Sequence, residues 1–121
     1  MDARTSNVVK KLKEAITKLN GDIANFGKKF KESPNYALEW SDSAFEAVAR
    51  RDIYVSLHEA LTVKDTEATV DSLLEYARKQ ARDGAKYPRR STSSGMNLMH
   101  QCETAVWAEV SDPLWGILSD L

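Results

Sequence analysis

The first quarter of the chain repeats apolar residues at the spacing of an amphipathic helix. Seven of them follow one another at alternating steps of three and four residues: Val9, Leu12, Ile16, Leu19, Ile23, Phe26 and Phe30. This spacing puts all seven on one face and predicts a long helix with an apolar seam, beginning after a cap at Ser6 and ending near Lys31. Ser33 and Pro34 reinforce that end, because a residue before proline is disfavoured in the helical region.

The next part of the chain is expected to form a short helical turn and then a second long helix. The turn spans 35–40 and is rich in aromatic residues. Ser43 and Glu46 have the spacing of a capping box, in which each side chain bonds the backbone N–H of the other residue. They predict a helix that starts there and continues with a helical apolar repeat to about Thr62.

A third helix, a loop and a fourth helix are expected after that. The third helix is predicted to begin near Asp65 or Thr66 and to end at Gly84, because glycine is the residue type that most often follows the last helical turn. Residues 84–95 combine basic residues with Gly, Ser and Pro, and they predict the longest loop of the chain. Helix is expected again over 94–110, where apolar residues return at helical spacing.

The end of the chain completes the predicted fold. Asp112 followed by Pro113 predicts one more short helix, since Asp is a good cap and Pro is favoured at the first helical position. No segment alternates apolar and polar residues cleanly, so no strand is expected. The sequence therefore predicts an all-α fold, a single helical domain over 1–121 built as a compact bundle of about five helices.

Length and composition agree with one soluble domain. The chain has 121 residues, of which 42% are hydrophobic and 29% charged, enough to bury a core without disulfides or metals. It shows neither an export signal at its start nor an apolar run of about 18 residues, so no membrane span is expected. Its single cysteine, Cys102, cannot form a disulfide within the chain. It fits a reducing compartment, which points to the cytoplasm.

The formal net charge of −1 hides four segments of alternating sign. Residues 1–31 and 78–90 each carry +5, whereas 32–77 carry −7 and 91–121 carry −4. Segregated charge of this kind is typical of a surface that meets a polyanion or a charged protein. A lysine-rich helix face that is merely solvated is the simpler alternative for the first segment.

The second basic segment has the chemistry of a phosphate-binding site. Arginine makes forked contacts to phosphate oxygens, hydroxyl groups donate to them, an aromatic ring stacks on a base, and a helix N-terminus attracts anions. The candidate residues are Arg78, Lys79, Arg82, Lys86, Tyr87, Arg89, Arg90, Ser93 and Ser94. The segment lacks the spacing of a P-loop, so no nucleotide cradle is expected. A plain flexible linker is the alternative.

Catalytic and metal-binding patterns are incomplete. His58 and Glu59 open like a zinc-protease motif, but Thr62 stands where the second histidine ligand is required. His100 and Cys102 are two residues apart and therefore point to different sides of a helix. We expect no enzyme activity, no metal and no cofactor.

Tryptophan and lysine residues supply candidates for a protein-binding surface. Tryptophan is enriched at binding hot spots, and Trp107 stands one position off the apolar stripe of its helix. The candidates are Trp107, Trp115, Lys28 and Lys29. Packing of the tryptophans in the core is the alternative, and exposure of Trp107 or Trp115 would indicate a partner surface.

These observations favour a binding protein over a catalyst. The first hypothesis is a small helical interaction protein, such as an adaptor, an inhibitor or a subunit of a larger complex, that binds a protein partner. The alternative is a nucleic-acid-binding module or ribonucleoprotein subunit that tolerates any sequence and uses the basic segments 4–31 and 78–90. The seam over 9–30 could also join two copies of the chain. A membrane-surface role is disfavoured, because a bundle uses that seam better.

Overall fold

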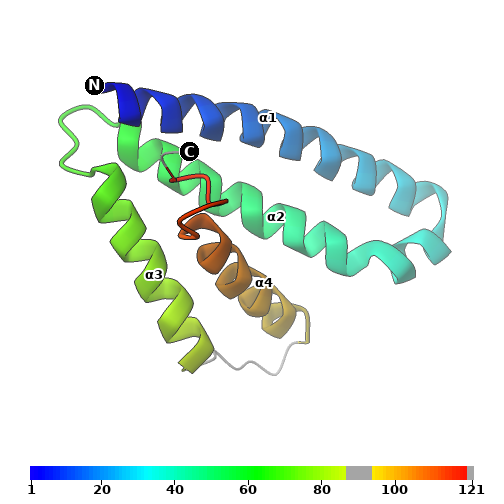
Figure 1. Ribbon diagram of the computed structural model, residues 1–121. Helices are drawn as coiled ribbons and strands as arrows, with labels where there is room; N and C mark the ends of the chain where they lie inside the picture. The colour runs from blue at the N-terminus through cyan, green and yellow to red at the C-terminus, as the bar shows by residue number, and fades with distance from the viewer. Residues whose placement is uncertain (87–93, 120–121) are drawn as a thin grey trace.

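The protein folds into four α-helices, as seen in a computed structural model that describes residues 1–86 and 94–119 (Figure 1). The helices are α1 (Ala3–Glu32), α2 (Pro34–Thr62), α3 (Val70–Lys86) and α4 (Ser94–Val110). No strand occurs in these residues, and none of their helices is long and apolar enough to cross a bilayer. The predicted all-α class is confirmed. The described residues form four helices instead of the expected five.

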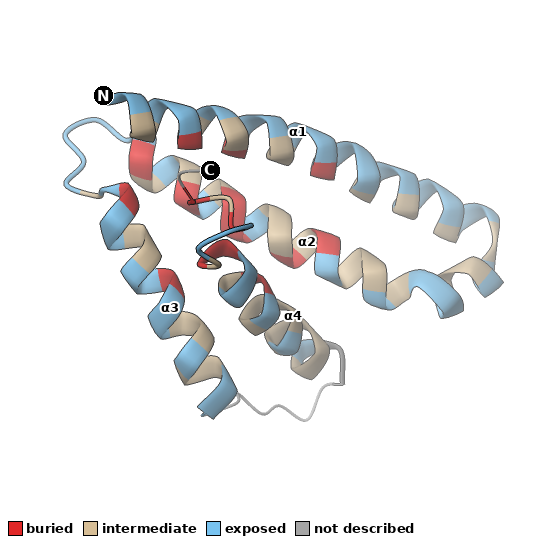
Figure 2. Cartoon of the chain, in the orientation of Figure 1, coloured by how far each residue is buried: buried red, intermediate tan, exposed pale blue. Residues whose placement is uncertain are grey.

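Two helical hairpins of unequal length make up the fold. α1 and α2 run antiparallel along each other, and the shorter α3 and α4 form a second antiparallel pair that packs on α2 through α4 (Figure 1). Buried residues concentrate where the two hairpins overlap (Figure 2). The largest fully buried side chains come from three helices and the C-terminal segment: Leu12, Leu57, Leu118, Val8, Val106 and Val110.

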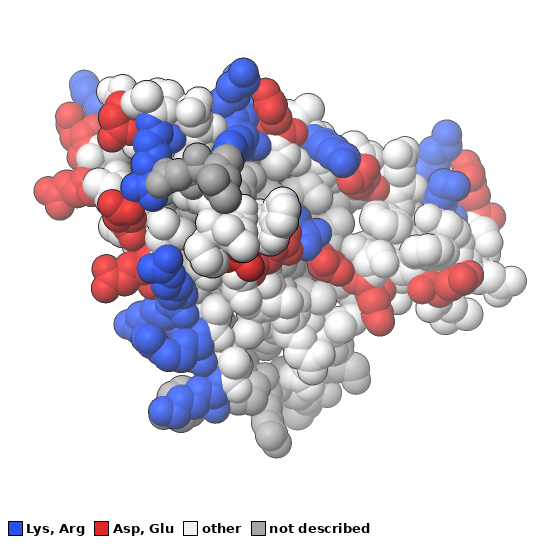
Figure 3. All heavy atoms as spheres, in the orientation of Figure 1, with Lys and Arg blue, Asp and Glu red and all other residues white. Residues whose placement is uncertain are grey.

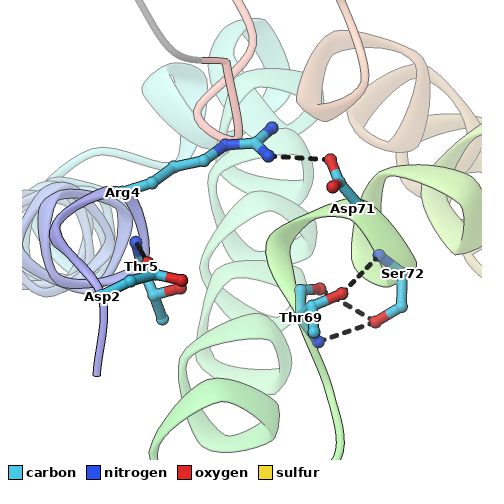
Figure 4. Close-up of polar contacts among 6 residues, drawn as sticks. All are labelled: Asp2, Arg4, Thr5, Thr69, Asp71 and Ser72. Atoms are coloured by element: carbon cyan, nitrogen blue, oxygen red, sulfur yellow. Dashed lines mark hydrogen bonds and ion pairs between the residues drawn. The ribbon is translucent and has the colours of Figure 1, made fainter.

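α1 is capped by Asp2 rather than by Ser6. The Asp2 carboxylate accepts a hydrogen bond from the backbone N–H of Thr5 at 2.7 Å (Figure 4), and this bond lowers the pKa of Asp2. Ser6 lies inside the helix, where its own N–H donates to the Asp2 carbonyl at 3.0 Å. The seam pattern starts too late to reveal this cap, because the first helical turn carries no apolar seam residue. The end of α1 at Glu32 agrees with the prediction.

α2 is one continuous helix, so the expected break between a short turn at 35–40 and a helix capped by Ser43 is wrong. Pro34 occupies the first helical position, where a backbone N–H has no acceptor within the helix, so the lack of this group in proline costs no hydrogen bond. No glycine or proline follows within the helix, so nothing in the backbone interrupts it. Glu46 lies inside the helix and pairs with Arg50 one turn later, at 2.9 Å.

α3 begins at Val70, later than the expected start at Asp65 or Thr66. Asp65 has a positive φ of 59°, which is left-handed and incompatible with the first turn of a right-handed helix. Thr69 and Ser72 form a reciprocal pair at the true start (Figure 4). The Thr69 hydroxyl accepts from the Ser72 N–H at 3.0 Å, and the Ser72 hydroxyl accepts from the Thr69 N–H at 2.8 Å.

One ion pair joins the start of α1 to the start of α3. A guanidinium nitrogen of Arg4 lies 2.8 Å from a carboxylate oxygen of Asp71 (Figure 4). The Asp71 side chain is 77% exposed, so water screens the pair. It therefore orients the two helix starts more than it stabilises them.

Gly84 lies inside α3 rather than ending it. The helix continues to Lys86, and Gly84 faces α4 at short range, because a Cβ atom at this position would overlap the side chain of Thr104. The missing side chain thus serves helix packing and not helix termination. Both ends of the expected loop over 84–95 are helical, since α3 runs to Lys86 and α4 begins at Ser94 as predicted, and the residues between them lie outside the described part of the chain.

The last helix expected from Asp112 and Pro113 does not form. Residues 111–119 are a series of turns and bends instead. The Asp112 side chain still accepts backbone N–H groups as a helix cap does, but the chain turns back at Gly116 before a helix can propagate. This segment returns to the core at Leu118, which is fully buried.

The α1–α2 hairpin is longer than the second hairpin can cover. α1 has 30 residues and α4 has 17, which correspond to about 45 Å and about 25 Å of helix. The far end of the hairpin, residues 20–46, therefore projects past the second hairpin (Figure 1, Figure 2). We call these residues the arm. Of the predicted seam, only Leu12 and Leu19 are buried; Val9 and Ile16 are half-buried, as are the three seam residues on the arm.

Candidate interaction surfaces

The described part of the predicted phosphate-binding segment forms a basic stripe on α3. Arg78, Arg82 and Lys86 follow one another at steps of four residues, and Lys79 stands beside Arg78. All four residues are exposed, and lysine and arginine atoms gather along the lower half of α3 in Figure 3. Arg82 lies 3.9 Å from Asp83, too far for a strong ion pair. The stripe therefore presents positive charge to solvent.

The rest of the predicted phosphate-binding set is placed only in part. Tyr87, Arg89, Arg90 and Ser93 lie outside the described residues. Ser94 is the first residue of α4, so the helix N-terminus expected after the basic segment is present. The structure thus brings together the α3 half of the predicted set.

Trp115 is the most exposed large hydrophobic residue in the described part of the chain, with 84% of its surface accessible. Leu114 beside it is 58% exposed; we call these two residues the turn pair. The Asp112 carboxylate accepts the backbone N–H groups of Leu114 and Trp115 at 2.8 and 2.9 Å. These two bonds favour the charged carboxylate and lower the pKa of Asp112.

The backbone around the turn pair is firmly anchored. Val110 before it and Leu118 after it are both fully buried. The Gly116 N–H donates to the Asp112 carbonyl at 3.0 Å, and a Cβ atom on Gly116 would overlap the Val110 carbonyl. Only glycine fits this close approach of two backbone segments. The turn pair is therefore presented to solvent at a defined position.

A hollow of about 540 Å³ opens beside the turn pair. Its lining comes from α1, α2 and the C-terminal segment and includes Lys11, Tyr54, Trp115, Ile117 and Ser119. Tyr54 is buried, and burial raises the pKa of its hydroxyl. The mostly apolar wall suits an apolar side chain of a partner better than a charged ligand.

The other predicted partner-binding residues lie elsewhere. Trp107 is half-buried between α3 and α4, where its ring meets Tyr76 edge-on with centroids 5.4 Å apart. Lys28 and Lys29 are exposed near the end of α1, on the arm. The structure therefore does not bring the four candidates into one surface, and Trp115 stands apart from the lysines.

Four aromatic rings follow one another along the tip of the arm. The rings of Phe26, Phe30, Tyr36 and Trp40 are separated in turn by centroid distances of 5.9, 5.8 and 5.9 Å. The Lys29 ammonium lies 5.4 Å from the centre of the Tyr36 ring. These distances are favourable for aromatic and cation–π contacts. The rings join α1 to α2 at the tip although no residue there is buried.

Leu38 is an exposed residue that no sequence pattern indicated. It is 83% exposed and Trp40 is 42% exposed; we call these two residues the arm pair. Leu38 stands three helical turns before the buried Ala49, on the same side of α2. It therefore has the spacing of a core residue, and its exposure follows from the length of the arm. The signal that could have found it is the α1 seam, which runs further than two shorter helices can cover.

The surroundings of Cys102 and Arg50 indicate structural rather than catalytic roles. Cys102 is half-buried, and burial together with the Glu46 and Asp42 carboxylates raises the pKa of its thiol. The thiol is therefore protonated at neutral pH, which disfavours a role as nucleophile. Arg50 donates to Glu109 at 2.7 Å and ties α2 to α4. No cluster of three or more His, Cys, Asp or Glu in the described residues is placed to hold a metal ion.

Comparison of the chain with models of known protein families, with curated proteins and with solved structures finds no match. Function has therefore to be inferred from the molecule itself. Three surfaces offer chemistry for binding: the turn pair, the basic stripe on α3 and the arm.

Proposed function

We propose that the protein is a non-catalytic helical interaction protein that binds a protein partner through the turn pair, Leu114 and Trp115. The observation that carries the proposal is the 84% exposure of Trp115 on a turn with a fixed backbone. Tryptophan buries a large apolar area on binding and dominates many protein interfaces. A turn that is already fixed loses little conformational freedom when a partner binds it.

The surroundings of the turn pair indicate what the partner looks like. Residues 91–121 contain four acidic residues and no lysine or arginine. Asp112 is the acidic residue closest in sequence to the turn pair, and the carboxylate of the next one upstream, Glu109, is paired with Arg50 at 2.7 Å. Lys11 also lines the hollow beside Trp115, so charges of both signs surround the turn pair, and a partner with an apolar pocket for Trp115 complements this surface mainly in shape.

An affinity capture with matched baits tests the proposal. The immobilised full chain is incubated with a lysate of its source cells, and the retained proteins are quantified by mass spectrometry. The first variant bait combines Leu114→Glu with Trp115→Glu. The control bait combines Leu38→Glu with Trp40→Glu, which changes the same residue types on the arm.

The two variant baits give opposite expected results. A partner retained by the unchanged chain and by the arm control, but lost from the turn-pair variant, supports the proposal. A partner retained equally by all three baits would show that the turn pair is not its binding site. All four substituted residues are exposed, but Trp40 also stacks on Tyr36 within the arm. Circular dichroism of both variants therefore has to match that of the unchanged chain before their retained proteins are compared.

The basic stripe on α3 favours a second candidate function, sequence-tolerant binding of nucleic acid. Its basic residues stand one helical turn apart and face solvent, as needed to follow a phosphate backbone. The test is titration of labelled DNA and RNA, single- and double-stranded, at low and at near-physiological salt. Arg78→Ala with Arg82→Ala is expected to weaken binding to all sequences alike and to flatten its salt dependence.

A control with the same loss of charge separates the stripe from the overall charge of the protein. Lys10 and Lys13 are exposed on α1, so Lys10→Ala with Lys13→Ala removes two positive charges away from α3. If both double variants weaken binding equally, the stripe is not a defined site. Absence of binding at low salt removes this candidate function.

A further inference from the structure

The arm is a two-helix layer that contacts the rest of the molecule only at its base, where Ile23 and Phe26 pack against the core. No residue between Leu19 and Ala47 is buried. The stretch nevertheless holds seven large apolar or aromatic side chains: Ile23, Phe26, Phe30, Tyr36, Leu38, Trp40 and Phe45. A pair of helices buries such residues only against a further layer of structure, which α4 and the C-terminal segment supply in the rest of the molecule.

The two helices of the arm carry net charges of opposite sign. On the arm α1 has three basic residues, Lys28, Lys29 and Lys31, and two acidic ones, Asp22 and Glu32, which leaves a small positive excess. The first turns of α2 have three acidic residues and no lysine or arginine, and these acids are Glu39, Asp42 and Glu46. In Figure 3 basic and acidic side chains both occur along the upper, α1 edge of the arm, whereas its lower, α2 edge shows acidic ones. The α1 side of the arm is therefore mixed with a small positive excess, and the α2 side is acidic.

The exposed arm pair flanks the acidic side. Glu39, Asp42 and Glu46 follow one another at steps of three and four residues and form one stripe on α2, in which Glu46 is already paired with Arg50 at 2.9 Å. Leu38 and Trp40 immediately precede and follow the first of these acids, so they point to either side of the stripe. A surface that covers the arm thus has to supply positive charge and apolar contact together.

We propose that this surface is the arm of a second copy of the chain, and that two arms pack antiparallel as a four-helix bundle with two-fold symmetry. Under two-fold symmetry the same patch serves both copies, and every contact occurs twice. The lysine-bearing α1 of one copy then lies beside the acid-bearing α2 of the other, on both sides of the axis. In this orientation the lysines of each arm lie opposite the acidic residues of the other arm. The inference does not depend on the turn pair, which lies outside the arm.

Sedimentation equilibrium of the full chain over a concentration series is the first test. The arm is short, so the interface is at the small end of stable protein interfaces, and a dissociation constant on the order of 10 μM is expected. The apparent mass should rise from that of one chain to that of two across this concentration. A mass of one chain throughout, or a mass that rises beyond two chains, would overturn the proposal.

Matched variants locate the interface. Leu38→Glu with Trp40→Glu is expected to give one chain at all concentrations, because it buries four carboxylates in a symmetric dimer. Leu114→Glu with Trp115→Glu is expected to dimerise like the unchanged chain. If the arm variant dimerises and the turn-pair variant does not, self-association belongs to the turn pair and the proposal for the arm is wrong. Partner capture tests the proposed function separately.

Charge reversal tests the antiparallel arrangement without touching the apolar residues. One variant combines Lys29→Glu with Lys31→Glu, and the other combines Glu39→Lys with Asp42→Lys; all four positions are exposed. Each variant alone is expected to dimerise at least tenfold more weakly than the unchanged chain. An equimolar mixture should form a one-to-one heterodimer, because the reversed charges again face opposite ones. Unweakened dimers of each variant alone, or no complex in the mixture, would contradict the arrangement.

Discussion

Gly84 of α3 packs directly against the side chain of Thr104 of α4, leaving no room for a Cβ atom. The Thr104 hydroxyl donates to the His100 carbonyl at 3.0 Å, which fixes its side chain. Gly84→Ala is therefore expected to lower the free energy of unfolding by about 1 to 3 kcal/mol, although alanine favours helix more than glycine does.

Chemical denaturation measures this effect, and a second glycine supplies the control. A Cβ atom at Gly21 would meet nothing within 4 Å, so Gly21→Ala should raise the free energy of unfolding by up to about 1 kcal/mol. Thr104→Ala should restore part of the loss in the Gly84→Ala background. The same sign for both glycine substitutions would show that α3 and α4 do not approach so closely.

The body of the α1–α2 hairpin and its arm should respond differently to loss of an apolar side chain. Leu12 is completely buried, whereas Ile23 on the arm is only half-buried. Leu12→Ala is expected to cost about 2 to 5 kcal/mol of unfolding free energy, and Ile23→Ala clearly less when measured in dilute solution, far below the dissociation constant expected for the proposed dimer. Equal losses in denaturant titrations would mean that the arm has a core of its own.

Arg50 should stabilise the contact between α2 and α4 mainly through Glu109. The Glu109 side chain is 47% exposed and the Glu46 side chain 52% exposed, so water screens both ion pairs. Glu109→Gln is expected to cost about 0.5 to 1.5 kcal/mol. Glu46→Gln should cost less, because its pair with Arg50 lies within one helix. Thermal unfolding, with Arg50→Met to close a double-mutant cycle, gives both values; a larger loss for Glu46 would contradict this assignment.

Acid should loosen the turn that presents Trp115. The pKa of Asp112 is lowered in the folded protein by the N–H groups of Trp115 and Leu114. The unfolded chain therefore takes up this proton first, and the stabilisation is complete above the ordinary aspartate pKa and is lost as pH falls through the lowered value. The protection of the Trp115 amide against hydrogen exchange, taken relative to the intrinsic exchange rate at each pH, should fall over that range.

Two substitutions at Asp112 check this reading. Asp112→Asn keeps an acceptor oxygen without a charge, so exchange at Trp115 should no longer depend on the titration of this side chain. Asp112→Ala removes both hydrogen bonds and should give fast exchange at every pH. Asp2 has a pKa shift of the same sign at the start of α1, so a local probe is required. Slow exchange in Asp112→Ala would show that the turn is held by other contacts.

Features set by local sequence could be predicted, and features set by distant contacts could not. The seam of α1 repeats from Val9 to Phe30, and the basic stripe on α3 depends only on helical spacing, so both follow from the sequence. Gly84 has the local character of a helix end, yet its role comes from Thr104, which reaches it only through tertiary packing. Ser43 has a good capping pattern, but the helix begun at Pro34 already runs through it.

From the sequence, a binding surface could be predicted at Trp107 or at Trp115, but the two could not be distinguished. Trp107 and Trp115 are equivalent candidates in the sequence, and the packing of Tyr76 against Trp107 separates them in the structure. The exposure of Leu38 depends on how far α4 reaches along α2, which requires the relative placement of two hairpins. No periodic pattern within a single helix contains that information.

The most direct test of the proposed function is the affinity of a captured and purified partner for the two matched variants. Isothermal titration should show that Leu114→Glu with Trp115→Glu weakens binding by about 30-fold or more, as expected for loss of an interface hot spot. Leu38→Glu with Trp40→Glu should leave the affinity of the partner unchanged. If instead the turn-pair variant binds the partner as tightly as the unchanged chain does, Trp115 is not the binding residue and the proposed function is wrong.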